Sequence, residues 1–326
     1  MKNSKRIAAL GLAAMMVAGL AGCGASSSQA GTDTTAQTQA EVVTDEKAGT
    51  ETGTTESAED GTEQTEVTTT ETFDETEIQV FAAASLSAVL EDLIADYNAK
   101  QPNVTITVNA DSSGTLLTQI QEGYECDVFF SAAQKQMNTL EEAGSLVDGT
   151  RANVVNNQVC VVTYPGSNTK VTGLANLSEA TSIALADGSV PVGKYTRQAM
   201  IKANMLTVSE GTEAADVTTQ QVSEALGGVE INECGNVSKV RTAITEQSNE
   251  VGTVYYSDTY GFEDQLEIIE KVGYDLTGDV IYPIAQVQNA EADELQTAAA
   301  KDFVTFITSD EAKAVFDKYL FDTNVK

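Results

Sequence analysis

Residues 77–326 alternate between strand-like and helix-like patterns, and this alternation limits the folds open to the chain more than any other feature. The first helix-like run, Leu86–Lys100, shows the helical period clearly, because its apolar residues recur three and four positions apart as far as Tyr97. A strand-like run, Ile78–Ala82, comes directly before it. Alternation of this kind with short loops is typical of an α/β fold in which helices cover both faces of a sheet, and such sheets bind ligands at the carboxyl ends of their strands.

The same pattern continues to the end of the chain. The predicted strands are Ile78–Ala82, Val104–Asn109, Asp127–Ser131, Val159–Thr163, Ser182–Ala186, Glu230–Glu233, Gly252–Ser257, Leu266–Ile269 and Ile281–Val287. The predicted helices are Leu86–Lys100, Thr115–Glu122, Gln134–Ala143, Lys194–Asn204, Ser238–Gln247 and a C-terminal helical region, Glu291–Phe321. This stretch is long enough for one sizeable core or for two smaller lobes.

The N-terminal part has a different character. Basic residues precede the apolar run Ile7–Gly22, which is shorter than the roughly 18 residues or more of a membrane-spanning helix and is typical of a signal peptide. The run ends in Leu-Ala-Gly-Cys23, which resembles the bacterial lipobox, where the cysteine is lipid-modified and becomes the mature N-terminus. We therefore predict a lipoprotein signal over residues 1–23, with a plain secretory signal as the alternative.

Residues 24–76 are rich in Thr, Glu, Gly, Ser and Gln and contain few large apolar side chains. Such a composition buries too little surface to offset the entropy of ordering, so a disordered acidic tether is expected. Treated as a flexible coil, it would reach on the order of 40 Å.

Composition excludes several function classes. The chain has no histidine, which excludes Ser-His and Cys-His nucleophile pairs and the usual histidine ligands of zinc. A formal net charge of −31 argues against nucleic acid as a partner, because phosphate neutralisation needs clustered Lys and Arg. A Ser-Lys hydrolase and an adhesive surface protein remain as alternatives. Cys126, Cys160 and Cys234 lack metal-like spacing and are interpreted as small buried residues, although one disulfide among them stays open.

Four strand-to-helix junctions share one property, which is that small or apolar residues leave the backbone N–H groups of a helix start uncovered. They are AAASL (Ala82–Leu86), DSSGTL (Asp111–Leu116), VPVGKY (Val190–Tyr195) and GNVSKV (Gly235–Val240). The first turn of a helix has unpaired amides and the positive end of the helix dipole, so it can hold an anion without a cationic side chain. Serine is also simply a common N-cap, which is the structural alternative for any one junction. A site made of neutral donors would favour a fully ionised oxyanion over a protonated one, whose O–H would face another donor.

At these residues the sequence resembles the molybdate-binding proteins, the extracytoplasmic solute receptors of molybdate ABC importers. The motifs that carry the resemblance occur in the family's order across nearly all of residues 77–326. They are VFAAASL (Val80–Leu86), SSGTL (Ser112–Leu116), CDVFFSAAQKQMNTL (Cys126–Leu140), VPVGKYTRQAM (Val190–Met200), NVSKVRTAI (Asn236–Ile244), GTVYYSD (Gly252–Asp258) and YPIA (Tyr282–Ala285).

The resemblance implies a set of ligand-binding residues. An oxyanion would be held by the hydroxyl and backbone N–H of two serines, by two further backbone N–H groups and by one tyrosine hydroxyl. By motif these residues are Ser85, Ser113, Val192, Val237 and Tyr255, and the neighbouring Tyr256 is the alternative to Tyr255. No cofactor, no catalytic residue and no direct ligand of a metal cation is implied, because molybdenum or tungsten would be bound as its oxyanion.

The resemblance also implies a two-lobe, periplasmic-binding-protein-like α/β fold of type II, in which each lobe is a mixed sheet flanked by helices. Lobe 1 would comprise residues 77–158 and 281–326, and lobe 2 residues 159–280. The predicted two-strand hinge consists of Val159–Thr163 and Ile281–Val287.

The function implied is binding without catalysis. A monomeric receptor, lipid-anchored through Cys23 at the outer face of the cytoplasmic membrane, would capture molybdate or tungstate in the cleft between the lobes and deliver it to an ABC permease. The alternative solute is sulfate or another tetrahedral oxyanion.

Overall fold

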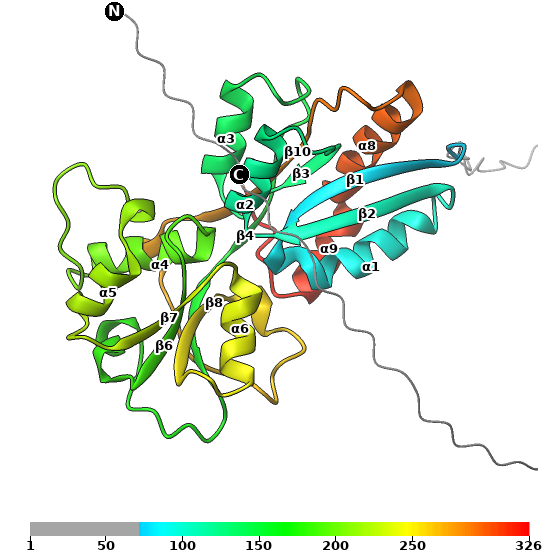
Figure 1. The fold of residues 1–326 in the computed structure, drawn as a ribbon. Coiled ribbons are helices and arrows are strands. Elements are labelled where there is room, and N and C mark those ends of the chain that lie inside the picture. Colours follow the sequence, from blue (N-terminus) through cyan, green and yellow to red (C-terminus); the bar gives the residue numbers. More distant parts are fainter. Residues whose placement is uncertain (1–71, 326) are drawn as a thin grey trace, which may run out of the picture. The chain divides into compact units, whose positions relative to one another are not determined.

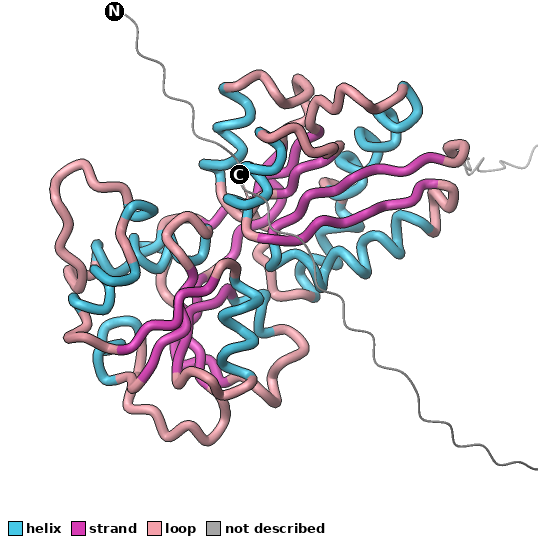
Figure 2. Tube along the Cα trace, in the orientation of Figure 1, coloured by secondary structure: helices cyan, strands magenta, loops and turns pink. Residues whose placement is uncertain are grey.

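The structure is a computed structural model that describes residues 72–325 (Figure 1). The predicted signal peptide, the lipidation of Cys23 and nearly all of the predicted tether lie outside these residues. The described part is an α/β fold built on two mixed five-stranded sheets with helices on their faces (Figure 2). None of its helices is both long enough and apolar enough to cross a membrane.

The first sheet has the strand order β2-β1-β3-β10-β4. The strands are β1 (Thr76–Ala83), β2 (Val104–Asp111), β3 (Val128–Phe130), β4 (Ala152–Asn157) and β10 (Val280–Gln286). Strands β1, β2 and β3 are parallel, whereas β10 runs antiparallel to both β3 and β4. The helices associated with this sheet are α1 (Ser87–Asn98), α2 (Ser113–Gln121), α3 (Gln134–Glu142), α8 (Glu294–Ile307) and α9 (Asp310–Lys318).

Both faces of the first sheet are covered, because successive strand residues point to opposite sides. In β1, Val80 and Ala82 belong to the larger hydrophobic cluster, which also contains Phe303 of α8. Phe81, between them in the sequence, packs instead in a smaller cluster with Leu116 of α2 and other apolar residues. This alternation explains why β1 is apolar along its C-terminal half rather than apolar at every second position.

The second sheet has the strand order β7-β6-β8-β5-β9. Its strands are β5 (Val159–Thr163), β6 (Ser182–Ala186), β7 (Glu230–Cys234), β8 (Val251–Tyr255) and β9 (Glu267–Lys271). Strands β6, β7 and β8 are parallel, whereas β5 is antiparallel to β8 and β9. The associated helices are α4 (Pro191–Lys202), α5 (Thr219–Ala225), α6 (Val237–Thr245) and α7 (Tyr274–Thr277), together with the 3-10 helices η2 (Leu174–Glu179), η3 (Ala214–Asp216) and η4 (Tyr256–Thr259).

Helices α4 and α6 pack against β8 from opposite sides. Thr253 forms a hydrogen bond with Thr196 of α4, with the two hydroxyl oxygens 3.0 Å apart. At the preceding residue, Gly252, a Cβ atom would lie 2.9 Å from a methyl carbon of Val240 and 3.1 Å from Ile244, both on α6. Glycine at this position therefore lets α6 lie directly on the strand.

The chain changes sheets twice. It leaves the first sheet at the end of β4, where only Gln158 separates Asn157 from β5, and returns from β9 through α7 to β10. Val159–Thr163 and Ile281–Val287, the predicted hinge strands, thus lie in the second and first sheets respectively.

The sequence patterns missed some elements. Strand β4 was not predicted because its apolar core is short and its end is rich in asparagine, and the short helices α5 and α7 were also missed. The C-terminal helical region is two helices, since Ser309 begins α9 as its N-cap. Cys126, Cys160 and Cys234 are buried and free, as interpreted, and no disulfide joins them.

Candidate functional site

A small cavity lies where the ends of several strands meet the beginnings of helices from both sheets. The empty space within it, including the part that is open to solvent, is about 200 Å³. Its lining consists of Ala83, Ala84, Ser85, Ser112, Ser113, Ala132, Val190, Pro191, Val192, Val237 and Tyr255. All five residues predicted to bind a ligand are in this set, and none of the lining side chains carries a charge.

Three helices begin at the cavity. In α2, α4 and α6 the residues at the wall, Ser113, Val192 and Val237, belong to the first helical turn. Their N–H groups have no hydrogen-bond partner within the described residues, as expected of the first turn. The side chain of Ser112 accepts from Thr115 N–H, and that of Asn236 accepts from Lys239 N–H. Each cap therefore bonds the N–H three residues further along the helix and leaves the N–H of the first helical residue, Ser113 or Val237, for a ligand.

The hydroxyl of Ser113 is oriented by the backbone of another loop. Its Oγ accepts a hydrogen bond of 2.9 Å from the N–H of Ala132, just after β3. Ser113 has no solvent exposure, so its own O–H hydrogen can point only within the protein or into the cavity. Because one lone pair of Oγ already accepts from Ala132 N–H, the hydroxyl hydrogen is available to donate to a ligand oxygen.

Ser85 lies in the single 3-10 turn η1 (Ala84–Leu86) between β1 and α1. Its Oγ is 2.8 Å from the hydroxyl oxygen of Tyr282, on β10. Both side chains are buried. The serine hydroxyl is therefore held at the cavity wall by a tyrosine that does not itself line the cavity.

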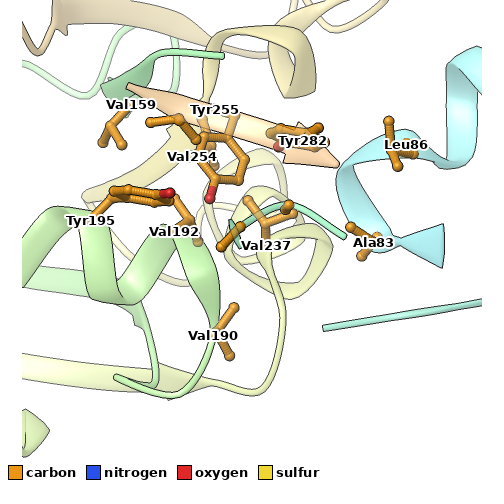
Figure 3. Close-up of a cluster of buried hydrophobic side chains, with 14 of the residues drawn as sticks. Ala83, Leu86, Val159, Val190, Val192, Tyr195, Val237, Val254, Tyr255 and Tyr282 are labelled. Carbon is orange, nitrogen blue, oxygen red and sulfur yellow. The ribbon is translucent and has the colours of Figure 1, made fainter. Parts of the chain in front are cut away.

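Tyr255 ends β8 and is 1% exposed, and its hydroxyl has no hydrogen-bond partner within the described residues. Figure 3 shows this hydroxyl directed toward Val192 and Val237. Burial raises the pKa of Tyr255 well above its ordinary value, so the group remains a neutral donor. Tyr256, the alternative, lies instead under the ammonium of Lys271 and faces a separate hollow.

A buried hydroxyl without a partner costs about 1–3 kcal/mol, whereas its hydrogen bond to a charged ligand would be worth about 1.5–3 kcal/mol. Tyr255→Phe is therefore expected to weaken anion binding roughly ten- to 150-fold while raising the stability of the ligand-free protein. Tyr256→Phe is the matched control and should change neither quantity. Calorimetric titration and urea unfolding of both variants measure the two effects, and a binding loss in Tyr256→Phe alone would move the assignment by one residue.

Asp258 is the carboxyl group nearest to this tyrosine in the chain, and it is buried. Its Oδ2 accepts a 3.0 Å hydrogen bond from Tyr255 N–H, and its Oδ1 is 4.0 Å from a guanidinium nitrogen of Arg241. Burial raises the pKa of Asp258 to about 6, although Arg241 and the Tyr255 N–H partly oppose the shift. Asp258 thus fixes the backbone at Tyr255 at an energetic cost when it is ionised.

This cost predicts a pH dependence of stability. The folded pKa of Asp258 lies above the unfolded one, so the carboxyl stabilises the fold fully below about pH 4, and this contribution is lost as the pH rises through about 6. At pH 7 the loss amounts to about 3 kcal/mol. The wild type should therefore lose stability relative to Asp258→Asn as the pH rises from 4 to 7. A difference that is constant over this range, measured by urea unfolding, would contradict the assignment.

Beside the cavity, residues at the start of α2, a helix of the first sheet, contact residues at the starts of α6 and α4, helices of the second sheet. Asn236 Nδ2 donates to Asp111 Oδ1 at 3.0 Å. A Cβ atom on Gly114 of α2 would lie 3.0 Å from the carbonyl oxygen of Ser189, before α4. The residues that line the cavity are almost inaccessible to solvent.

Comparison with known proteins places the chain in a family. The model of the bacterial extracellular solute-binding protein family matches residues 78–322. The chain belongs to this family. Because its members bind solutes, the prediction that the chain is not an enzyme is confirmed.

Individual relatives agree with this assignment. The chain is 29% identical over 253 residues to YvgL of Bacillus subtilis, which is named as an ABC transporter substrate-binding lipoprotein, with coverage of 77% of this chain and 88% of YvgL. It is 28% identical over 255 residues to the molybdate-binding protein ModA of Escherichia coli, with coverage of 76% and 90%. The predicted resemblance to the molybdate-binding proteins is confirmed by these similarities.

Solved structures confirm the predicted two-lobe fold of type II. The substrate-binding domain of a protein named as a molybdenum ABC transporter from Clostridium difficile has a TM-score of 0.55 and 27% identity, covering 77% of this chain and 99% of that one. The sulfate-binding protein SubI of Mycobacterium tuberculosis has a TM-score of 0.60 at 16% identity, covering 76% and 86%, which shows likeness of fold alone.

Sequence reasoning missed the residues that support the binding groups. Tyr282 lies within the YPIA motif, but nothing in that motif shows that its hydroxyl meets Ser85. Ala132 lies in the long CDVFFSAAQKQMNTL motif and acts through its backbone, which no side-chain pattern reveals.

Proposed function

We propose that the chain is the receptor of an ABC importer and binds molybdate or tungstate, as the intact dianion, in the cavity that contains Ser85, Ser113, Val192, Val237 and Tyr255. The observation that carries this proposal is the unpartnered Tyr255 hydroxyl beside first-turn N–H groups, in a cavity without charged side chains. Every free polar group of this set is a donor, which suits an oxyanion that bears no proton. The similarity to ModA proteins supports molybdate as the solute.

Neutral donors are adequate for a dianion here, because a buried site with helix dipoles stabilises negative charge without a neighbouring cation. The strongly acidic surface does not oppose binding at ordinary salt, since charges more than about 8 Å away are largely screened. A Ser-Lys mechanism has no support in this cavity, since no lysine is among its lining residues.

The proposal extends to location and partners. A monomeric receptor would be tethered by the lipid on Cys23 to the outer face of the cytoplasmic membrane, with residues 24–76 as the spacer. YvgL, named as a lipoprotein, supports this arrangement. The permease of the importer would then receive the anion when the two lobes separate.

Thermal unfolding with molybdate, tungstate, sulfate and phosphate, each added alone at equal ionic strength, tests the proposal. A ligand at about 1,000 times its dissociation constant should stabilise the protein by about 4 kcal/mol. We expect large shifts with molybdate and tungstate alone. A shift with sulfate alone would keep the donor set but make the protein a sulfate receptor, and a shift with none of the four would refute oxyanion binding.

A further inference from the structure

The amide side chain of Asn157, at the point where the chain leaves the first sheet, has a defined orientation. Its Oδ1 accepts a 2.9 Å hydrogen bond from the backbone N–H of Gln158 and faces the N–H of Ser257 at 3.5 Å. A backbone N–H can only donate, so the oxygen must lie on that side. The Nδ2 group consequently donates in the other direction, to Ser257 Oγ at 2.8 Å and to the Tyr282 hydroxyl at 3.2 Å.

This orientation determines the direction of the next hydrogen bond. The Tyr282 hydroxyl accepts from Asn157 Nδ2 and is fully buried. Among the described residues, the acceptor within reach of its own hydrogen is Ser85 Oγ, 2.8 Å from its oxygen, so we assign the proton between the two hydroxyls to the tyrosine. Burial raises the pKa of Tyr282 well above its ordinary value, so this proton is retained at physiological pH. The tyrosine therefore donates to Ser85 Oγ.

Ser85 is left with one hydrogen and no protein group that accepts it among the described residues. The serine is buried at the cavity wall, so its O–H is directed to the ligand. Ser113 is arranged in the same way, since its Oγ accepts from Ala132 N–H. In both cases a protein group donates a hydrogen bond to the serine Oγ, so the serine's own O–H is left to donate to the ligand.

We infer that Asn157 and Tyr282 are positioning residues that fix Ser85 as a hydrogen-bond donor and so make the site select fully deprotonated oxyanions against hydrogen phosphate and similar anions that keep a proton. This inference rests on the proposed oxyanion function. It assigns the selectivity to a chain of hydrogen bonds, Asn157 to Tyr282 to Ser85, outside the ligand's own contacts. Asn157 also bonds Ser257, so the chain connects β4 and β10 of the first sheet with η4, directly after β8 of the second.

The test compares affinities for a fully deprotonated anion and for hydrogen phosphate in wild type and in Tyr282→Phe. The variant keeps the ring that packs on Tyr255 and Phe321 but removes the donor to Ser85. The serine can then turn a lone pair toward a protonated ligand oxygen. We expect molybdate binding to weaken about ten-fold or more and hydrogen phosphate to weaken less or to strengthen, so that the ratio of the two affinities falls about ten-fold.

Tyr97→Phe is the matched control, because Tyr97, near the end of α1, is also a buried tyrosine with a hydrogen-bonded hydroxyl, 3.0 Å from Asp302. It should leave the ratio unchanged. Asn157→Ala, in which Tyr282 remains but loses its fixed direction, should lower the ratio in the same sense. Equal losses for both anions in Tyr282→Phe, or phosphate binding that stays undetectable while molybdate weakens little, would overturn the inference.

The wild-type titrations separate this inference from the proposed function. If sulfate rather than molybdate is the preferred ligand, the proposed solute is wrong, and the ratio of sulfate to hydrogen phosphate tests the same hydrogen-bond chain. A wild-type preference for hydrogen phosphate over every fully deprotonated anion would overturn the inference directly. Binding of none of these anions would overturn both.

Discussion

Ser113→Ala is expected to weaken molybdate binding roughly ten- to 150-fold and also to lower the stability of the ligand-free protein. The binding loss follows from removal of a hydrogen bond to a charged ligand, worth about 1.5–3 kcal/mol. The stability loss follows because Ser113 Oγ is the acceptor for Ala132 N–H, which is buried and would be left without a partner at a cost of about 1–3 kcal/mol. Ser85→Ala should weaken binding by a similar factor.

Ser131→Ala is the matched control for this experiment. Ser131 is fully buried near Ser113, and its Oγ likewise accepts from a backbone N–H, that of Ala133, at 3.2 Å. It does not line the cavity, so the variant should lose stability without a comparable loss of affinity. Calorimetry and urea unfolding together distinguish the two results. Unchanged affinity in both Ser85→Ala and Ser113→Ala would refute the site.

Arg197→Met is expected to lower the free energy of unfolding by about 3–5 kcal/mol, the largest stability effect predicted for this protein. Arg197 has no solvent exposure. Its guanidinium donates to the carbonyl oxygens of Val217 at 2.8 Å, Ala186 at 2.7 Å and Gly193 at 3.0 Å, and to Thr219 Oγ1 at 2.9 Å. Removal of the guanidinium would leave three carbonyl groups without this partner, since methionine fills the volume but cannot donate.

The same contacts give Arg197 an influence on the site. They join the end of β6 to the first turn of α4, the turn that presents Val192 to the cavity. Arg197→Met should therefore also weaken anion binding. Lys318→Met is the control: Lys318 pairs with Asp92 at 2.7 Å and both side chains are about half exposed, so its loss should cost little stability. If urea unfolding shows that Arg197→Met loses no more than about 1 kcal/mol, the buried hydrogen bonds of Arg197 contribute little to stability.

The sequence predicted the parts of the site that depend on local pattern. The junctions that contain Ser113, Val192 and Val237 could be located because strand and helix periods differ and because small or apolar residues mark each junction. The choice of these three residues came from the resemblance to the molybdate-binding proteins. Tyr255 was selected by motif alone, with Tyr256 as a competing register, and the structure places only Tyr255 on the cavity.

Contacts between distant segments could not be predicted in this way. Ser85 and Tyr282 are 197 residues apart, and Asn157 and Tyr282 are 125 apart. Hydrophobic periodicity and secondary-structure propensity describe local sequence, so they cannot show which two buried side chains the tertiary fold will place in contact. Strand β4 was missed for a related reason, because its asparagines are typical of turns and their burial depends on partners such as Val280 N–H and Ser257 Oγ.

The most direct test of the central claim, that neutral donors from both lobes hold the anion in this cavity, is to locate molybdenum by its anomalous scattering in crystals grown with molybdate. The account predicts one strong peak within the cavity, with oxygens in hydrogen-bond reach of the Ser85, Ser113 and Tyr255 hydroxyls and of the Val192 and Val237 N–H groups. An ordered crystal with a peak only elsewhere, or with none in the cavity, would contradict it.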